Sequence, residues 1–385
     1  MRGIRTLACA AASFAVFALA TAPAHAGVVN PDISLIGQPV IRWTDAPGDS
    51  SRKRFVLDPG ETEVMIDAPL NPYARGSAVF SFSNGGVDVE EAYFQMNNGL
   101  PAGLAIKGGK YRVGFGKLNP AHPHAYPFAD RPHVLAAYLP GDEAFNETGL
   151  QASKVFALPG DIALTASADW LQGNTFRIAR APSGALNDPL VAAGGESAAD
   201  RSDEPRPAAL GRLSAFVPIG DRSGLELGTS YTQGTNDVAA ATRTTVYGGD
   251  AKLKYWTGAN SYVLVQAEYL GLNRENAGWD STAAAYTKST VSPSGGYAFL
   301  DWNFNPKYDA GVSVESFQDP SRGDATGSAF GAFAGVALME ETTSFRIGWE
   351  HYTPAQAPGT ASPDAVNTVT IRVLYSMGPH KAHQF

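Results

Sequence analysis

The chain has 385 residues, of which 44% are hydrophobic and 17% charged, and its formal net charge is −8 at neutral pH. This acidic balance argues against nucleic acid as a partner. The single cysteine, Cys9, lies near the N-terminus, so disulfides and cysteine-ligated metals are excluded from the rest of the chain.

The first 26 residues are predicted to be a secretory signal peptide. Arg2 and Arg5 precede an apolar stretch from residue 7 to residue 22, and Ala24-His25-Ala26 forms a small-x-small cleavage site before Gly27. Removing the two arginines lowers the basic count from 29 to 27 against 37 acidic residues, which moves the net charge from −8 to −10. The mature chain, residues 27–385, is predicted to be exported as a single domain.

No apolar run of 18 or more residues follows the signal peptide, so no helix is predicted to span a bilayer. A membrane-embedded form of the chain would have to be a closed sheet, because only a closed sheet satisfies every backbone group within lipid without helices.

Sixteen strands are predicted along the mature chain. They start near Asp32, Glu61, Tyr73, Val87, Ala102, Glu147, Asp161, Ala208, Ser223, Thr244, Ser261, Gly295, Lys307, Thr326, Thr342 and Val366.

The connections between these strands alternate in length. The short set is 70–72, 97–101, 159–160, 220–222, 257–260, 305–306 and 339–341. The other set is 44–60, 117–146, 171–207, 233–243, 272–294, 318–325 and 354–365, with one tight hairpin at 84–86. Short turns at one end and long loops at the other are typical of outer-membrane barrels, with the short turns in the periplasm.

Alternation of apolar and polar residues supports the same fold. In the strand near Thr342, Phe345, Ile347 and Trp349 share one face, whereas Arg346 and Glu350 share the other. The pattern recurs at 225–231, 263–269, 298–304 and 368–376. We expect the apolar faces to contact lipid and the polar faces to line a lumen. The prediction is an all-β transmembrane antiparallel β-barrel of about 16 strands, with long extracellular loops and short periplasmic turns.

The strand that starts near Ala102 carries Lys110 and Arg112 on one face, and Tyr111, Val113 and Phe115 are expected to face lipid on the other. On the preceding strand, Glu90 and Glu91 point to opposite faces. We expect one of them to pair with Lys110 or Arg112, either within the wall or as an exposed ion pair at the rim.

Several motifs resemble a poorly characterised family of Gram-negative outer-membrane proteins, which is more distantly similar to phosphate-selective porins. They are NPDIS at 30–34, NPYAR at 71–75, VEEAY at 89–93, GKYR at 109–112, FGKLN at 115–119, HPH at 122–124, PF at 127–128 and DRP at 130–132. They cover about the first third of the mature chain. The resemblance implies a porin-like barrel of 16 strands and no established substrate.

The loop at 117–146 carries candidate metal ligands. His122 and His124 are two residues apart, and Asp130 and His133 follow. Two imidazoles and a carboxylate would suit Zn²⁺. Four prolines stiffen the same loop, so its histidines could instead serve only as hydrogen-bonding groups of a folded extracellular or constriction loop. The C-terminal His380 and His383 are predicted to lie on the periplasmic side, apart from this site.

Ten charged residues are candidates to line a pore: Lys110, Arg112, Lys252, Lys254, Glu268, Asp301, Glu315, Arg346, Glu350 and Arg372. Mixed signs predict weak ion selectivity, or opposed charges that orient polar solutes. The simpler interpretation is that each charge solvates a water-filled wall.

These features favour an outer-membrane channel that passes small polar or ionic solutes by passive diffusion. The alternatives are a metal- or ligand-binding receptor that uses the loop 117–146, and a soluble periplasmic all-β binding protein. The chain has no Gly-x-Ser-x-Gly, phosphate-loop or zinc-protease motif, so an enzyme is not predicted. The expected partners are outer-membrane lipid, the barrel-assembly machinery, which reads a terminal aromatic such as Phe385, small solutes, and two further copies in a homotrimer.

Overall fold

The computed structural model describes residues 30–141, 144–180, 182–192, 206–339, 342–356, 359, 361 and 363–378. The predicted signal peptide, with Cys9, and the C-terminal His380, His383 and Phe385 lie outside these residues. Within the described residues, no helix is both long and apolar enough to cross a membrane.

Strands dominate the described residues. They are β1 (Asp32–Thr44), β2 (Phe55–Pro69), β3 (Ala74–Ser83), β4 (Gly86–Met96), β5 (Leu104–Arg112), β6 (Asn146–Leu158), β7 (Ile162–Leu171), β8 (Ala208–Ile219), β9 (Ser223–Asp237), β10 (Thr242–Trp256), β11 (Tyr262–Asp280), β12 (Ala285–Val291), β13 (Ser294–Asn305), β14 (Tyr308–Gln318), β15 (Thr326–Met339), β16 (Thr343–Thr353) and β17 (Val366–Met377). The short helices are η1 (Pro101–Gly103), η2 (Pro123–Ala125), α1 (His133–Tyr138), η3 (Asn174–Phe176) and α2 (Pro189–Ala192).

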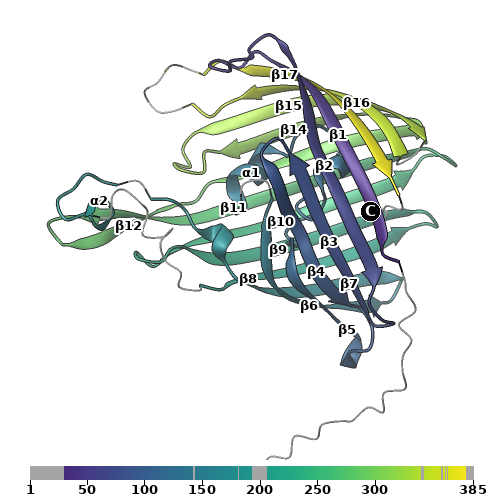
Figure 1. The fold of residues 1–385 in the computed structure, drawn as a ribbon, viewed down its shortest axis with the longest axis horizontal. Coiled ribbons are helices and arrows are strands. Elements are labelled where there is room, and N and C mark those ends of the chain that lie inside the picture. Colours follow the sequence, from purple (N-terminus) through teal and green to yellow (C-terminus); the bar gives the residue numbers. More distant parts are fainter. Residues whose placement is uncertain are drawn as a thin grey trace, which may run out of the picture. The chain divides into compact units, whose positions relative to one another are not determined.

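The strands close into a barrel (Figure 1). Each strand pairs antiparallel with the next, and β17 returns to pair with β1 from Leu35↔Met377 to Thr44↔Thr368. β12 is not part of the wall, because β11 pairs with β13 over its first half and with β12 only from Arg274 to Asp280. Sixteen strands therefore close the barrel, which confirms the predicted fold class.

The predicted alternation of short and long connections is also confirmed, with three differences. The predicted long loop 233–243 is a connection of only four residues, 238–241, because β9 runs to Asp237 and β10 begins at Thr242. β2 begins at Phe55 rather than near Glu61, because Pro59-Gly60 forms an irregularity within the strand instead of a turn, and the β1–β2 register shifts opposite it, between Gln38 and Val40. The predicted loop 272–294 forms the β11–β12 ribbon, which projects from the barrel beside α2 (Figure 1).

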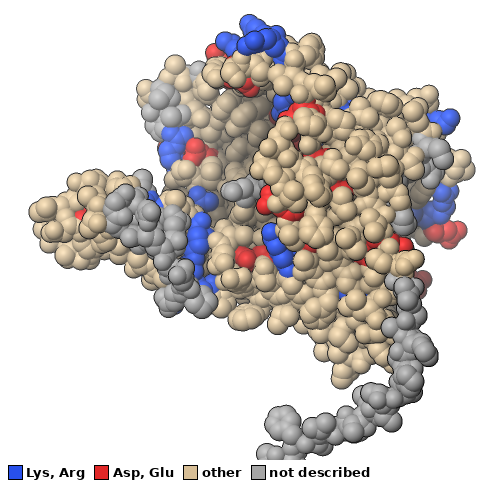
Figure 2. All heavy atoms as spheres, in the orientation of Figure 1, with Lys and Arg blue, Asp and Glu red and all other residues tan. Residues whose placement is uncertain are grey.

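Apolar side chains cover the outside of the barrel. On β16, Phe345, Ile347 and Trp349 are 43%, 51% and 39% exposed. In a two-layer sandwich such a row would be buried, whereas in a membrane it faces hydrocarbon. The alternative of a soluble periplasmic protein is therefore wrong. Figure 2 shows charged side chains gathered around the hollow of the visible face and near the ends of the molecule, with broad uncharged areas between them.

One predicted lipid-facing row is wrong. Tyr111, Val113 and Phe115 are at most 1% exposed and belong to the buried apolar cluster inside the barrel. Val113 and Phe115 are buried because β5 ends at Arg112, after which the chain turns into the lumen. Tyr111 still belongs to β5 and faces inward from the strand, where its hydroxyl donates to Asp169 of β7. The alternation continues past the end of the strand, but the surface that these residues contact is protein instead of lipid.

Gly109 is required for the close approach of β4 and β5. Its φ of +131° is unfavourable for any other residue, and an added Cβ would lie 2.2 Å from the carbonyl oxygen of Ala92. We expect Gly109→Ala to lower the free energy of unfolding by about 1–3 kcal/mol, as measured by urea unfolding in lipid vesicles. Gly211→Ala is the matched control, since the space around Gly211 is open. Equal stability of the two variants would contradict this assignment.

Candidate functional site

The chain between β5 and β6, residues 113–145, folds into the barrel, and we call it the constriction loop. It contains η2 and α1, and α1 lies within the ring of strands (Figure 1). Its side chains form an apolar core inside the barrel with Tyr111, and Leu118, Tyr126, Val134 and Leu135 are nearly inaccessible to solvent. Phe128 packs on Phe299 and Phe333 of the wall, with ring centroids 5.2 and 6.1 Å apart. The loop therefore fills much of the lumen.

Carboxylates of the wall accept hydrogen bonds from backbone N–H groups of the constriction loop. Glu268 on β11 accepts from Lys117 at 3.0 Å and from Leu118 at 2.7 Å. Glu315 on β14 accepts from His133 at 3.0 Å and also from Val134, at the start of α1. An irregular buried backbone needs such partners, because its polar groups cannot reach water.

Guanidinium groups of the wall donate to carbonyl groups of the same loop. Arg372 on β17 donates to Pro123 at 2.9 Å and to Tyr126 at 2.7 Å. Arg346 on β16 donates to Pro127 at 2.8 Å, and Arg112 donates to Ala121 at 3.2 Å. The loop is therefore bound to wall segments that are far apart in the sequence.

The predicted pore-lining residues thus divide into two sets. Six of them contact the constriction loop: Arg112, Glu268, Glu315, Arg346, Glu350 and Arg372. Five of them form hydrogen bonds with backbone groups of the loop, which take the place of water, whereas Glu350 contacts the ring of His133 and its side chain remains 37% exposed. The other four lie elsewhere in the barrel: Lys110, Lys252, Lys254 and Asp301. A role of any of the ten in lining a conducting path stays a prediction.

A cavity of about 770 Å³ opens beside the constriction loop. It lies between residues 136–141 of the loop, η3 and the wall, and Lys110 and Arg112 line it together with Glu90. On η3, Phe176 packs edge-on against Phe145, with ring centroids 5.5 Å apart. The predicted loop 171–207 therefore begins by folding onto the constriction loop at the mouth of the barrel.

A bulge in β4 places both Glu90 and Glu91 inside the barrel. Val79 of β3 pairs with Glu91 and Phe80 pairs with Val89, so Glu90 is the additional residue. Arg112 forms an ion pair with Glu90 at 3.0 Å, and both side chains are buried. The predicted pairing across the sheet is confirmed, and the alternative of an exposed pair at the rim is wrong.

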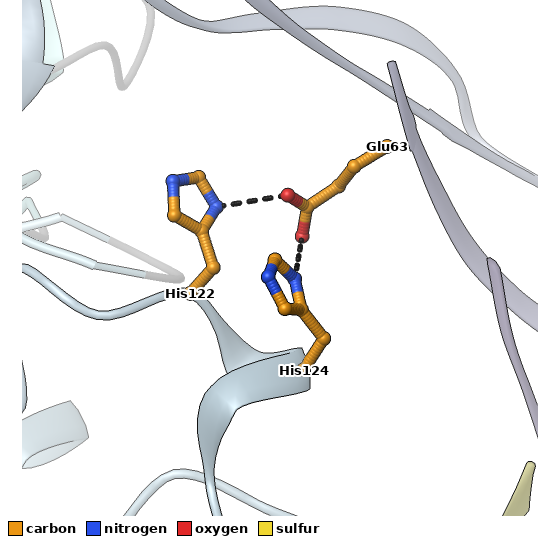
Figure 3. Close-up of side chains that lie close together, drawn as sticks. All are labelled: Glu63, His122 and His124. Carbon is orange, nitrogen blue, oxygen red and sulfur yellow. Dashed lines mark hydrogen bonds and ion pairs between the residues drawn. The ribbon is translucent and has the colours of Figure 1, made fainter. Parts of the chain in front are cut away.

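The four predicted metal ligands are not brought together. His122 and His124 both contact Glu63 on β2: Nδ1 of His122 lies 3.0 Å from Oε2, and Nδ1 of His124 lies 3.0 Å from Oε1 (Figure 3). Asp130 instead pairs with Arg42 of β1. His133 lies 3.2 Å from Glu350 and stacks on Tyr352 at 4.2 Å. The predicted set of four is therefore wrong, because the short helix α1 turns His133 toward β16.

His122 and His133 both favour the charged form. Burial opposes protonation of His122, but the negative charge of Glu63, its close contacts with the carboxylates of Glu63 and Glu90, and the hydrogen bond with Glu91 outweigh burial and raise its pKa well above the ordinary value. Burial also opposes protonation of His133, yet the hydrogen bond with Glu350 and the charge of Glu315 raise its pKa. The loop thus meets a wall that attracts positive charge on β2, β4, β14 and β16.

Comparisons with known proteins agree with this fold. OmpF of Salmonella typhi, in complex with daunomycin, superimposes with a TM-score of 0.56 at 10% identity, over 90% of this chain and 97% of that one. The outer-membrane channel DcaP of Acinetobacter baumannii gives 0.55 at 11% identity, over 90% and 97%. The anion-selective porin of Comamonas acidovorans gives 0.53 at 9% identity, over 90% and 100%.

An uncharacterised protein of Aquifex aeolicus is 31% identical over 261 residues, or 65% of this chain. The chain spans about half of that relative, 52% of its length. No family model matches the chain. The chain has the fold of the outer-membrane porins. Like the matched porins, it closes a wall of β-strands around a lumen.

Proposed function

We propose that the protein is an outer-membrane channel that passes small polar or ionic solutes by passive diffusion. The observation that carries this proposal is the combination of a closed wall of sixteen strands with a loop that narrows the lumen without being part of the wall. A barrel of this size is wide enough for an aqueous passage, which an inward loop would restrict.

Charges of both signs remain beyond the constriction loop. Lys252 and Lys254 extend from β10, and Asp301 from β13. Lys117 of the loop pairs with Glu226 of β9 at 2.5 Å. A passage lined by charges of both signs should admit cations and anions alike, so we expect weak ion selectivity.

Planar-bilayer recording tests the channel. The purified barrel should produce discrete conductance steps, with a reversal potential close to zero in a salt gradient. Protein heated until its barrel unfolds is the control and should give no steps. A preparation that shows the mobility shift of a folded barrel and never conducts would contradict the channel.

Two further expectations remain proposals. One of the matched structures, OmpT of Vibrio cholerae, is described in a trimer form, with a TM-score of 0.53 at 11% identity over 90% of this chain and 99% of that one. This likeness supports a homotrimer. That the chain is not an enzyme also stays a prediction.

A further inference from the structure

The contact between the constriction loop and β2 brings together three side chains that can bind a metal ion. His122 and His124 flank Pro123 at the start of η2, and their rings stack with centroids 5.5 Å apart. Both Nδ1 atoms face the carboxylate of Glu63, which extends from β2 between them (Figure 3). The three ligand atoms lie within 4.8 Å of one another.

The contact between Glu63 and His122 is close without being a hydrogen bond. Glu63 Oε2 and His122 Nδ1 are 3.0 Å apart, yet among the described residues neither atom has a hydrogen-bond partner. In a tetrahedral zinc site with bonds of about 2.0–2.1 Å, neighbouring ligand atoms lie roughly 3.3 Å apart. The two atoms therefore already have nearly the spacing of ligands that share one ion.

Glu91 orients the ring of His122. Its Oε1 lies 2.7 Å from His122 Nε2, on the side of the ring opposite to Glu63. When an ion displaces the proton of Nδ1, Nε2 keeps its proton in the hydrogen bond to that carboxylate, and the lone pair of Nδ1 points to the position between the two histidines and Glu63. Carboxylates hold metal-binding histidines in this way, and they fix both the tautomer and the ring orientation.

The surroundings carry an excess of negative charge. Glu61, Glu63 and Glu90 lie within 4.8 Å of one another, and Glu91 is on the other side of His122. Arg112 pairs with one member of this group, Glu90, at 3.0 Å. The side chains of Glu63 and His124 are each 2% exposed, so water does not reach the contact between them. The carboxylates of Glu63, Glu90 and Glu91 would attract a divalent cation to this position.

We propose that Glu63, His122 and His124 bind a divalent transition-metal ion of the Zn²⁺ class and that this ion ties the constriction loop to β2. Two imidazoles and a carboxylate are a donor set that Zn²⁺ prefers, whereas Ca²⁺ and Mg²⁺ prefer oxygen ligands alone. Glu90 is placed to supply a fourth ligand, since its Oε2 lies 3.1 Å from His122 Nδ1. The ion can enter from the 770 Å³ cavity, which Glu90 lines. This inference does not depend on conduction.

Calorimetric titration of the untagged, folded barrel with ZnCl₂ tests the site. The wild-type protein should bind one Zn²⁺ per chain, and His122→Gln/His124→Gln should lose this binding. His133→Gln is the matched control and should retain it, because His133 contacts β16 instead of β2. MgCl₂ should give no binding heat. Equal heats for the wild-type and double-variant proteins, or negligible heat for both, would overturn the proposal.

Two additional variants test the role of Glu91 and exclude Zn²⁺ binding by the C-terminal histidines. Glu91→Gln leaves all three proposed ligands in place, and loss of its charge should weaken Zn²⁺ binding by about 10–100-fold. An unchanged affinity would remove Glu91 from the site and with it the argument for the orientation of His122. His380→Gln/His383→Gln should bind like the wild type. If its heat vanishes, the ion binds at the C-terminus and the proposal fails.

Discussion

Replacement of residues 117–143 by a short Gly-Ser linker should raise the single-channel conductance severalfold. The segment removed contains η2, α1 and the part of the buried apolar cluster that the loop contributes: Leu118, Tyr126, Val134, Leu135, Tyr138 and Leu139. Its loss leaves an aqueous passage bounded by the wall alone, and the passage of an unobstructed sixteen-stranded barrel is wide. The β5–β6 pairing from Leu104↔Lys154 to Arg112↔Asn146 is kept, so the wall should still close. Planar-bilayer recording at fixed salt measures the change.

A matched control separates this effect from general damage to loops. Residues 281–284, at the tip of the β11–β12 ribbon, lie outside the barrel (Figure 1), and their replacement by the same linker should leave the conductance unchanged. A folded loop variant with wild-type conductance would show that the constriction loop does not limit the passage of ions. Increased conductance in both variants would point to an effect of loop replacement in general.

The wall of the barrel was predictable from the sequence because each strand carries its own evidence. On β16 and β17, Phe345, Ile347 and Ile371 alternate with Arg346 and Arg372, and the structure places the first set outside and the second inside. Period-two alternation can be recognised within a single strand, and a three-residue turn can be told from a long loop by its length alone.

The inward path of the constriction loop could not be predicted in the same way. Tyr111, Val113 and Phe115 satisfy the alternation of a lipid-facing row, but they pack inside the barrel. An apolar face indicates burial away from water and does not distinguish lipid from protein. The end of β5 at Arg112 decides between them, and no local signal marks it, since Gly114 and Gly116 fit either a strand or a turn.

Of the candidate metal site, the sequence predicts the two histidines and does not predict Glu63. His122 and His124 are close in sequence, whereas Glu63 is 59 residues or more away from both and reaches them only through the closure of the barrel and the entry of the loop. Asp130 and His133 were nearer in sequence and are held elsewhere by Arg42 and Glu350. The sequence indicates which carboxylates face the inside of the barrel, and any of them could contact the two histidines. Which one does so depends on the strand register and on the path of the loop.

Arg372→Met should release the η2 part of the constriction loop from the wall. The guanidinium of Arg372 is buried and donates to the carbonyl groups of Pro123, the first residue of η2, and of Tyr126, which follows η2. Each hydrogen bond to a charged donor contributes about 1.5–3 kcal/mol, and the side chain of methionine has a similar length and no donor. Because removing a buried charge also relieves its desolvation, we expect a net loss of about 3 kcal/mol in the docking of residues 121–128.

Hydrogen exchange reports this loss directly, because local opening sets the exchange rate of buried amides. The amides of Ala125 and Tyr126 are hydrogen-bonded within the loop, to His122 and Pro123. A loss of about 3 kcal/mol should raise their exchange roughly 100-fold, as read by mass spectrometry of the peptide 117–128. Arg222→Met is the control, since Arg222 is bound to the turn at Gly258 and Ala259, far in sequence from the loop, and should leave the peptide unchanged. Unchanged exchange in Arg372→Met would mean that the apolar core, and not the charges of the wall, holds the loop inside the barrel.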